Sequence, residues 1–263
     1  LPGACVIVES TSPVGTTERV AAIIAELRPD LAVPRDGSTD EADIALAYCP
    51  ERVLPGRIVN ELVHNDRVIG GVTAACAERA AVLYTSFVKG ACLTTTARVA
   101  ETVKLVENSF RDVNIAFANE LSMIADVIGV DVWEVIRLAN RHPRVDILQP
   151  GPGVGGHCIA VDPWFLVAGA PEVARLVRTA REVNDHKAVH TEAKIRALLN
   201  AAPDGKVALL GLAFKPDIDD FRESPALEIA ESLSHTHGDR IMVVEPFTED
   251  LPAAFAGTGA ELV

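Results

Sequence analysis

The chain is poor in several features that define large classes of protein. Its 263 residues contain no apolar run near the roughly eighteen residues that a membrane-spanning helix requires. No basic segment followed by an apolar stretch and a cleavage site opens the chain, so no secretory signal is predicted and a cytoplasmic location is expected. Basic residues are also scarce, since 24 Lys and Arg stand against 37 Asp and Glu and give a net charge of −13. Nucleic acid and anionic membranes are therefore not expected as partners, because both require a basic surface.

Cysteine is present but lacks the spacing of a structural framework. The five cysteines form an odd set without CxxC or CxxH patterns, so neither a disulfide framework nor a metal site is predicted. The thiols are expected to be reduced. With 49% hydrophobic residues, the chain can bury a large core, and one to three domains are expected.

Short apolar runs alternate with helical segments in the first hundred residues, as in an α/β sheet. Residues 4–9 are bounded by turn residues and predict a buried parallel strand, followed by a helix of about twelve residues from Thr17. Further strands are expected at 44–49, 67–69 and 91–95, with a helix at 73–84.

From Arg98 the hydrophobic period changes to that of a long helix. Its apolar stripe consists of Val99, Val103, Val106, Phe110, Val113, Phe117, Leu121, Ile124 and Ile128. A helix of about thirty residues is about 45 Å long, so we expect it to bridge two domains and to pair with a second copy of itself. Gly129 is expected to end it, Asp131 to start a short helix through about Ala139, and residues 171–199 to form another long helix.

The α/β pattern returns after Pro203. Residues 206–210 and 240–244 predict strands, and Ser224 and Pro225 predict the N-cap and first residue of the helix between them. A strand, loop and helix in this order can direct amides at a phosphate, although residues 203–263 contain neither GxGxxG nor GxxxxGK[ST]. The predicted division is therefore 1–96, 97–202 and 203–263, and the chain is expected to be an internal piece of a longer protein because it opens directly on a strand.

The stretch GPGVGGHCIAVDP, residues 151–163, is the strongest candidate for chemistry. Glycine allows close backbone approach to a ligand and positive φ, which favours a catalytic role for Cys158 in this loop, with Asp162 four residues on. The alternative is an ordinary buried thiol.

A second candidate lies on the long helix, where Lys104, Asn108 and Arg111 share one face and can hold an anionic or hydroxyl-rich ligand. The alternative is a solvated face, with Glu101 and Glu107 paired to the lysine.

Five motifs that cover nearly the whole chain resemble the UDP-glucose/GDP-mannose dehydrogenase family. They are ESTSPVGT, CPERVLPG, AETVKLVENSFRDVNIAFANE, GPGVGGHCIAVDP and GLAFKPDIDDFRESP, in that order. The resemblance implies the remainder of a Rossmann-like NAD-binding domain at 1–96, a helical dimerisation domain at 97–202, and the start of a Rossmann-like UDP-sugar-binding domain from 203. It implies a homodimeric, NAD-dependent enzyme that oxidises the C6 alcohol of a UDP-sugar to a carboxylate for surface polysaccharide synthesis.

The same resemblance implies residue roles. Cys158 is the implied nucleophile, which forms a thiohemiacetal and then a thioester, and Glu51 is the implied general base of thioester hydrolysis. Lys104 and Asp162 would handle the alcohol proton and developing charge, and Asn108 would bind the sugar. The implied cofactor contacts are Ser10, Thr11, Ser12 and Arg222, and the implied substrate contacts are Arg52, Val53, Lys104, Asn108, Arg111, His142, Arg144, Gly155 and Lys215. Taken singly, each arginine is better explained as a surface charge, and its placement within a family motif is what favours a binding role.

Two departures from the family pattern matter. Pro55 stands where UDP-glucose dehydrogenases carry a second glutamate, which favours a hexosamine substrate. The glycine-rich NAD fingerprint is absent, so little NAD turnover is expected from these residues alone. Among the members of the family, the motif forms most resemble those of enzymes that act on UDP-N-acetylmannosamine. UDP-N-acetylglucosamine is the alternative substrate, because its dehydrogenases are closely similar, although they tend to carry proline where Ala160 stands.

Two other classes of function remain open. A cysteine hydrolase would need a histidine beside Cys158, with His157, His142, His186 or His190 as candidates. A noncatalytic module for dimerisation or nucleotide-sugar binding would use the long helix.

Overall fold

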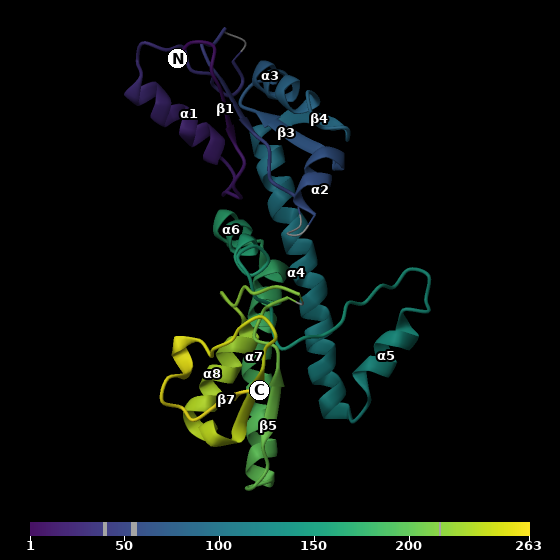
Figure 1. Ribbon diagram of the computed structural model, residues 1–263. Coiled ribbons are helices and arrows are strands. Elements are labelled where there is room, and N and C mark those ends of the chain that lie inside the picture. Colours follow the sequence, from purple (N-terminus) through teal and green to yellow (C-terminus); the bar gives the residue numbers. More distant parts are fainter. Residues whose placement is uncertain (39–40, 54–56, 216) are drawn as a thin grey trace. The chain divides into compact units, whose positions relative to one another are not determined.

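The computed structural model describes residues 1–38, 41–53, 57–215 and 217–263, and these form two compact units. Unit 1 comprises Leu1–Glu107 with Ala168–Pro171, and unit 2 comprises Asn108–Val167 with Glu172–Val263 (Figure 1). Pro55, at the predicted departure from the family pattern, lies outside the described residues.

Unit 1 contains a four-stranded sheet in the order β1-β2-β3-β4. Its strands are β1 (Cys5–Val8), β2 (Ala45–Tyr48), β3 (Arg67–Gly71) and β4 (Cys92–Thr96), which agrees with the four predicted runs. The pairs β1–β2 and β3–β4 are parallel, whereas β2 and β3 are antiparallel. The carboxyl end of β2 therefore lies at the same end of the sheet as the amino end of β3.

The prediction that residues 4–9 form a buried strand is wrong in its burial. β1 is an edge strand that pairs with β2, and its residues range from half-buried to exposed. The fully buried strand of this sheet is β2. An apolar run alone does not distinguish an edge strand from a central one, which accounts for the error.

Two helices cover opposite faces of this sheet. Ile44 and Leu46 pack with Ala21 of α1 (Thr16–Leu27), whereas Ala47 and Cys49 pack with residues of α3 (Ala74–Thr85). Alternate residues of a strand point to opposite faces, so this parity places α1 and α3 on different sides of β2. A further helix, α2 (Ile58–His64), was not predicted from the sequence.

The long helix is α4 (Ala97–Ile128), which begins in unit 1 and continues into unit 2. Gly129, at φ 74°, follows it, and Asp131 caps α5 (Val132–Ala139) by accepting from Trp133 N at 2.9 Å, as predicted. Most of the predicted apolar stripe is exposed rather than packed. The exposed members are Val99, Val106, Phe110, Phe117, Ile124 and Ile128.

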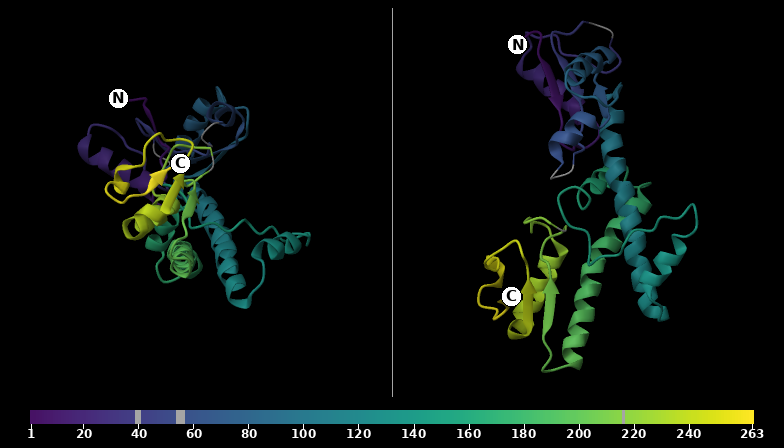
Figure 2. Two further views of the ribbon diagram at one scale, coloured as in Figure 1. Left: turned by 60° about the horizontal axis from the view of Figure 1, so that its bottom comes forward. Right: turned by 45° about the vertical axis from the view of Figure 1, so that its right-hand side comes forward.

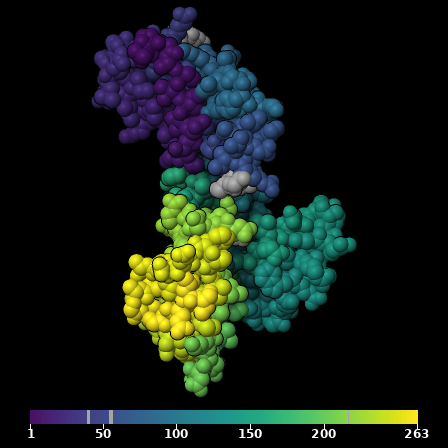
Figure 3. All heavy atoms as spheres, in the orientation of Figure 1, coloured from purple at the N-terminus to yellow at the C-terminus, as the bar shows by residue number. Residues whose placement is uncertain are grey.

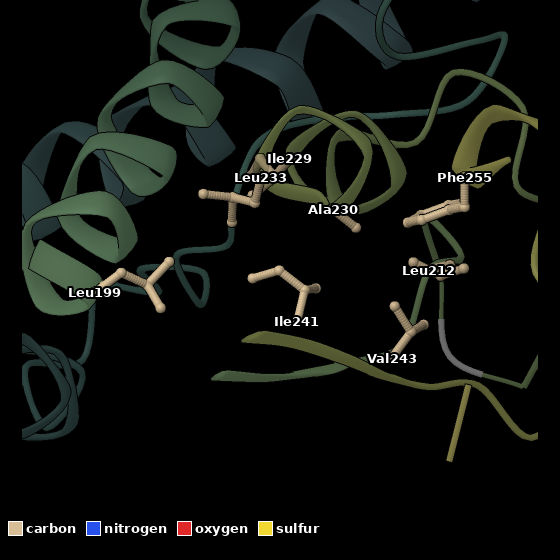
Figure 4. Close-up of a cluster of buried hydrophobic side chains, with 8 residues drawn as sticks. All are labelled: Leu199, Leu212, Ile229, Ala230, Leu233, Ile241, Val243 and Phe255. Atoms are coloured by element: carbon tan, nitrogen blue, oxygen red, sulfur yellow. The ribbon is translucent and has the colours of Figure 1, made fainter. Parts of the chain in front are cut away.

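Unit 2 contains a parallel sheet in the order β5-β6-β7, formed by β5 (Val207–Leu210), β6 (Ile241–Val244) and β7 (Glu261–Leu262). Helix α8 (Pro225–His237) begins as predicted, with Ser224 as N-cap and Pro225 in its first turn. Leu199 of α7 (Arg175–Ala201), Leu233 of α8 and Ile241 of β6 belong to one buried cluster, which Figure 4 shows in full. Two short 3₁₀ turns, η1 (Gly238–Arg240) and η2 (Ala253–Phe255), lie between α8 and β6 and between β6 and β7. Figure 2 gives two further views of this C-terminal part of the chain, coloured yellow-green to yellow.

Between α5 and α7 the structure differs from the prediction. Residues 162–169 form a separate helix, α6 (Asp162–Gly169), so the loop predicted over residues 151–163 ends two residues earlier than expected. The following long helix begins at Arg175 rather than at Pro171. Within the described residues, no helix combines the length and apolar character needed to cross a membrane.

Candidate functional site

Cys158 is exposed in the turn that leads into α6. The carbonyl oxygen of Cys158 accepts from the backbone N–H of Asp162 at 2.8 Å and from that of Val161 at 3.1 Å. These bonds fix the backbone of the thiol-bearing residue while its side chain remains accessible. The alternative of an ordinary buried thiol therefore does not apply to Cys158.

Two glycines of the loop are required by close packing against the segment before α8. A Cβ atom on Gly155 would lie 2.3 Å from the carbonyl oxygen of Glu223 and 2.7 Å from Cβ of Phe214. Gly156, at φ 84°, donates its N–H to the same Glu223 carbonyl at 3.2 Å. Larger residues would push the loop away from this segment, so the glycines set the position of the backbone on which Cys158 is held.

Asp162 and Asn108 are brought together as a buried pair in unit 2. Nδ2 of Asn108 donates to Oδ2 of Asp162 at 2.5 Å, and the two residues are 7% and 3% exposed. A carboxylate oriented by an amide in this way can accept a proton from a bound alcohol or stabilise a neighbouring cation. The sequence had predicted both residues for the site.

A buried polar network that the sequence analysis missed supports the start of the same loop. Oδ1 of Asn119 on α4 accepts from Gly151 N at 2.9 Å, and its Nδ2 donates to Asn184 of α7 at 2.9 Å. Asn184 donates in turn to Asp112, which accepts from Arg181 at 2.7 Å. Burial raises the pKa of Asp112, and the contacts with Arg181 and Asn184 oppose that shift. Polar residues recurring at 108, 112 and 119 on one helix face were the signal available in the sequence.

Unit 1 holds the predicted residues Glu51, Arg52, Val53 and Lys104. Oε1 of Glu51 accepts from the backbone N–H groups of Arg52 at 2.7 Å and Val53 at 3.0 Å. The Arg52 guanidinium forms an ion pair with Glu107 of α4 at 2.6 Å. Lys104 is half-buried on α4.

Neither carboxylate that could have paired with Lys104 does so in the described residues. Glu107 is paired with Arg52. Glu101, also on α4, is buried against the start of α1. Oε2 of Glu101 accepts from Gly15 N at 2.6 Å, and Oε1 accepts from Thr17 N at 2.8 Å and Thr17 Oγ1 at 2.7 Å. Lys104 is therefore not neutralised by either glutamate that the sequence had suggested.

The contacts of Glu101 also determine whether the start of α1 could bind the phosphates of a dinucleotide. The amides at the start of α1 are occupied by its carboxylate, so this helix end offers no cradle for a pyrophosphate. Ser10 is exposed, Thr11 is half-buried, and Ser12 is buried with its hydroxyl donating to Ser10 O at 2.8 Å. The hydroxyl groups at the end of β1 could therefore contact a non-phosphate part of a dinucleotide, whereas this region offers no binding site for the phosphates.

Four other predicted residues are exposed in unit 2. Lys215 and Arg222 lie on the loop between β5 and α8, and His142 and Arg144 lie after α5, in the segment that Figure 3 colours teal. Arg222 pairs with Asp220 at 2.8 Å and holds the pKa of that carboxyl at about 2. Arg111 is also exposed, and within the described residues neither it nor Lys215 nor Arg144 forms an ion pair, so these three cations are open to an anionic ligand.

The histidines do not support a cysteine hydrolase. Among the residues that the structure describes, none of them forms a hydrogen bond with Cys158. Nδ1 of His142 accepts from Arg144 N at 3.3 Å, and His190 lies 3.2 Å from Asp126. Without an adjacent base, the nucleophile–base arrangement of a hydrolase is absent from the described part of the chain.

A cavity of about 430 Å³ in unit 2 is bordered by residues of the thiol loop. Its lining includes Val154 and Trp164 together with the carboxylates of Asp185, Glu223 and Glu228. Burial raises the pKa of Glu228, and the neighbouring Glu223 and Asp185 raise it further. Three clustered carboxylates disfavour a nucleoside diphosphate, so this cavity does not fit the diphosphate part of a UDP-sugar.

Three family models of the UDP-glucose/GDP-mannose dehydrogenase family match this chain. The NAD binding domain matches residues 2–88, the central domain residues 98–186, and the UDP binding domain residues 208–263. The chain belongs to this family, as its motifs had indicated.

Similar proteins include UDP-N-acetyl-D-mannosamine dehydrogenase of Escherichia coli (strain K12), which is 58% identical over 97% of this chain and 62% of that protein. NDP-N-acetyl-D-galactosaminuronic acid dehydrogenase of Ralstonia nicotianae is 57% identical over 97% of this chain and 60% of that protein. The solved UDP-D-ManNAc dehydrogenase of Pyrococcus horikoshii has a TM-score of 0.82 and 43% identity, covering 95% of this chain and 60% of that structure. The chain thus spans about three fifths of the length of these relatives.

Proposed function

We propose that the natural protein carrying these residues oxidises the C6 alcohol of UDP-N-acetyl-D-mannosamine to a carboxylate, for surface polysaccharide synthesis. The observation that carries the proposal is Cys158, exposed on a glycine loop that packs on the segment before α8 and leads directly to the buried Asn108–Asp162 pair. The three family matches and the 58% identity to the E. coli enzyme support the same reaction.

Oxidation of an alcohol to an acid removes four electrons, which explains the need for a thiol. NAD, when bound, accepts the hydrides, two NAD molecules being consumed for each sugar. The aldehyde carbon formed first adds the Cys158 thiolate and becomes a thiohemiacetal, which can lose hydride where a free aldehyde cannot. Loss of that hydride leaves a thioester, whose C–S bond is broken by water to give the carboxylate and restore the thiolate.

The proposed roles of the other residues follow from their chemistry. Lys104 and Asp162 accept and relay the proton of the C6 hydroxyl and stabilise the oxyanion, and Asn108 orients Asp162 and the sugar. Glu51 takes the proton of the hydrolytic water. Ser10, Thr11, Ser12 and Arg222 are proposed cofactor contacts. The proposed substrate contacts are Arg52, Val53, Arg111, His142, Arg144, Gly155 and Lys215.

We further propose a homodimer formed through α4 and the three-domain division at 1–96, 97–202 and 203–263. Phe110 is 68% and Phe117 is 55% exposed one heptad apart, which is more apolar surface than a solvated helix normally presents. A catalytic thiol must stay reduced, so a cytoplasmic location is inferred.

The decisive test is substitution of Cys158 in the full-length protein. Cys158→Ala is expected to abolish formation of the acid from UDP-N-acetyl-D-mannosamine, whereas Cys5→Ser, at another exposed cysteine, is expected to retain it. Products and NADH are measured together by chromatography and absorbance. Undiminished acid formation by Cys158→Ala would overturn the proposal.

Substrate choice is tested with a panel of nucleotide sugars. UDP-N-acetylmannosamine is expected to give the highest kcat/KM among UDP-N-acetylglucosamine, UDP-N-acetylgalactosamine and UDP-glucose. The galactosamine sugar belongs in the panel because the R. nicotianae relative is 57% identical to this chain. A higher kcat/KM for another member of the panel would reassign the substrate and leave the reaction unchanged.

A further inference from the structure

A buried arginine lies beneath the carboxylate of Glu51 in unit 1. Arg67 is the first residue of β3 and only 1% exposed, whereas the side chain of Glu51 is 42% exposed. The antiparallel pairing of β2 with β3 explains this contact. It places the start of β3 beside the end of β2, and Glu51 lies three residues after that end. Nη1 of Arg67 lies 3.5 Å from Oε1 of Glu51.

Three donors of the described residues converge on Oε1 of Glu51. Oε1 accepts from Arg52 N at 2.7 Å and Val53 N at 3.0 Å in addition to Arg67. The side chain is nevertheless 42% exposed. The carboxylate is therefore held in one orientation while remaining accessible, as a base acting on water must be.

Arg67 is itself fixed by its surroundings. Nη2 donates to Leu62 O at 3.1 Å, and the guanidinium lies 5.9 Å from the centre of the Tyr84 ring. The Tyr84 hydroxyl donates to Glu9 at 2.6 Å, which anchors the ring. Nε of Arg67 is buried without a partner in the described residues. A buried cation that is only partly satisfied is costly, and an apolar side chain would fill the same space at lower cost, so packing alone does not account for Arg67.

We propose that Arg67 is a positioning residue for hydrolysis of the Cys158 thioester, acting by holding Oε1 of Glu51. The inference rests on the proposed function and concerns only its last step, in which the Glu51 carboxylate accepts a proton from water. The water oxygen bonds to the thioester carbon, the C–S bond breaks, and the electron pair returns to the thiolate. Substrate binding and both oxidations precede this step and do not depend on Arg67.

The test uses the full-length protein and separates oxidation from hydrolysis. Arg67→Met is expected to keep a rapid burst of two NADH per Cys158 with UDP-N-acetyl-D-mannosamine, while steady turnover falls about 10²-fold, the lower range for loss of a general base. Quenched samples are expected to show the acyl group on Cys158 by intact-protein mass spectrometry. Arg67→Lys, which retains the charge but not the planar fork, is expected to restore part of the turnover.

Glu51→Gln and Arg240→Met are the controls. Glu51→Gln is expected to accumulate the same acyl-enzyme, and the double variant Glu51→Gln/Arg67→Met is expected to lose no more turnover than Glu51→Gln alone. Arg240 is a half-buried arginine of unit 2 that donates to the carbonyl oxygens of Gly205 and Leu199, and Arg240→Met is expected to lower stability without accumulating acyl-enzyme. If Arg67→Met does not fold, the burst and the acyl-enzyme are measured on Arg67→Lys, whose reduced turnover must show the same signature.

The outcomes distinguish the two proposals. If Glu51→Gln accumulates the acyl-enzyme and neither Arg67 variant does, the inference about Arg67 is overturned and the proposed function stands. If the wild-type protein forms no acyl group on Cys158 and Glu51→Gln turns over normally, the proposed function itself is overturned. Loss of burst and turnover together in a folded Arg67 variant would assign Arg67 a purely structural role.

Discussion

The side-chain amide of Asn108 lies 2.5 Å from Oδ2 of Asp162, and this hydrogen bond joins α4 to the first residue of α6 inside unit 2. Both residues are nearly inaccessible to water, so neither can exchange its partner for solvent without local opening. The bond fixes the helix that begins four residues after the thiol.

Replacing Asn108 by leucine leaves the Asp162 carboxylate buried without this donor. The free energy of unfolding is expected to fall by about 1–3 kcal/mol, the range for loss of a buried hydrogen bond to a charged group. Urea unfolding followed by circular dichroism measures the change. Asn114→Ala removes an exposed side-chain bond to Phe110 O on the same helix and is expected to change stability by less than about 0.5 kcal/mol. Equal effects of the two substitutions would contradict the importance of the buried pair.

Gly155→Ala is expected to displace the thiol loop. Its new Cβ would lie 2.3 Å from the Glu223 carbonyl oxygen, and relief of that overlap is expected to cost about 1–3 kcal/mol of stability. Thermal unfolding gives the loss, and the rate of Cys158 alkylation by iodoacetamide reports the change in loop position. Gly169→Ala, where an added Cβ meets nothing within 4 Å, is the matched control and is expected to leave both measurements close to wild type.

Lys187 provides a prediction of pH dependence. Burial lowers its pKa from 10.5, and its ammonium donates to Ser122 at 2.7 Å. Between the lowered pKa and 10.5 the unfolded chain binds more protons than the folded one, so the stability contributed at this site rises with pH through that window. Lys187→Met is expected to be more stable than wild type at pH 7, with the difference shrinking toward pH 10.

Urea unfolding of both proteins at several pH values measures this difference. Lys194→Met, on the same helix, removes an exposed lysine that pairs with Asp126 at 2.7 Å and is expected to give no such gain. A wild type more stable than Lys187→Met at pH 7 would show that the Ser122 bond outweighs the desolvation of the ammonium.

Phe117→Asp tests the proposed homodimer. A charge in the centre of an apolar helix contact is expected to cost at least about 2 kcal/mol, which corresponds to about a 30-fold weaker association. Analytical ultracentrifugation over a concentration series measures the dissociation constant. Val189→Glu on α7, where the valine is 61% exposed, carries the same kind of change away from the stripe and is expected to leave association intact. Unchanged association of Phe117→Asp would exclude α4 as the interface.

Local chemistry accounts for what the sequence predicted correctly. The four strands of unit 1, the end of α4 at Gly129 and the caps Asp131 and Ser224 all follow from turn and capping preferences that act within a few residues. The glycines around Cys158 likewise predicted that it lies in a loop, where the structure shows it exposed.

Contacts made at a distance account for what the sequence did not show. The buried side of α4 carries Glu101, Asp112 and Asn119, and a search for hydrophobic period instead finds the exposed stripe through Phe110 and Phe117. The partners of Glu101 and Asn119 lie in α1, α7 and the thiol loop, and no periodicity within α4 identifies them.

The packing of Gly155 and Gly156 against Phe214 and Glu223 has a consequence for how the protein is made. A ribosome releases the chain from its amino end, so the cysteine emerges before the residues on which its loop rests. The thiol loop therefore acquires its folded geometry only after the later segment has been synthesised and folded. A nascent chain arrested before Phe214 would carry an accessible thiol on an unformed loop, so the proposed nucleophile would become functional only once that later segment exists.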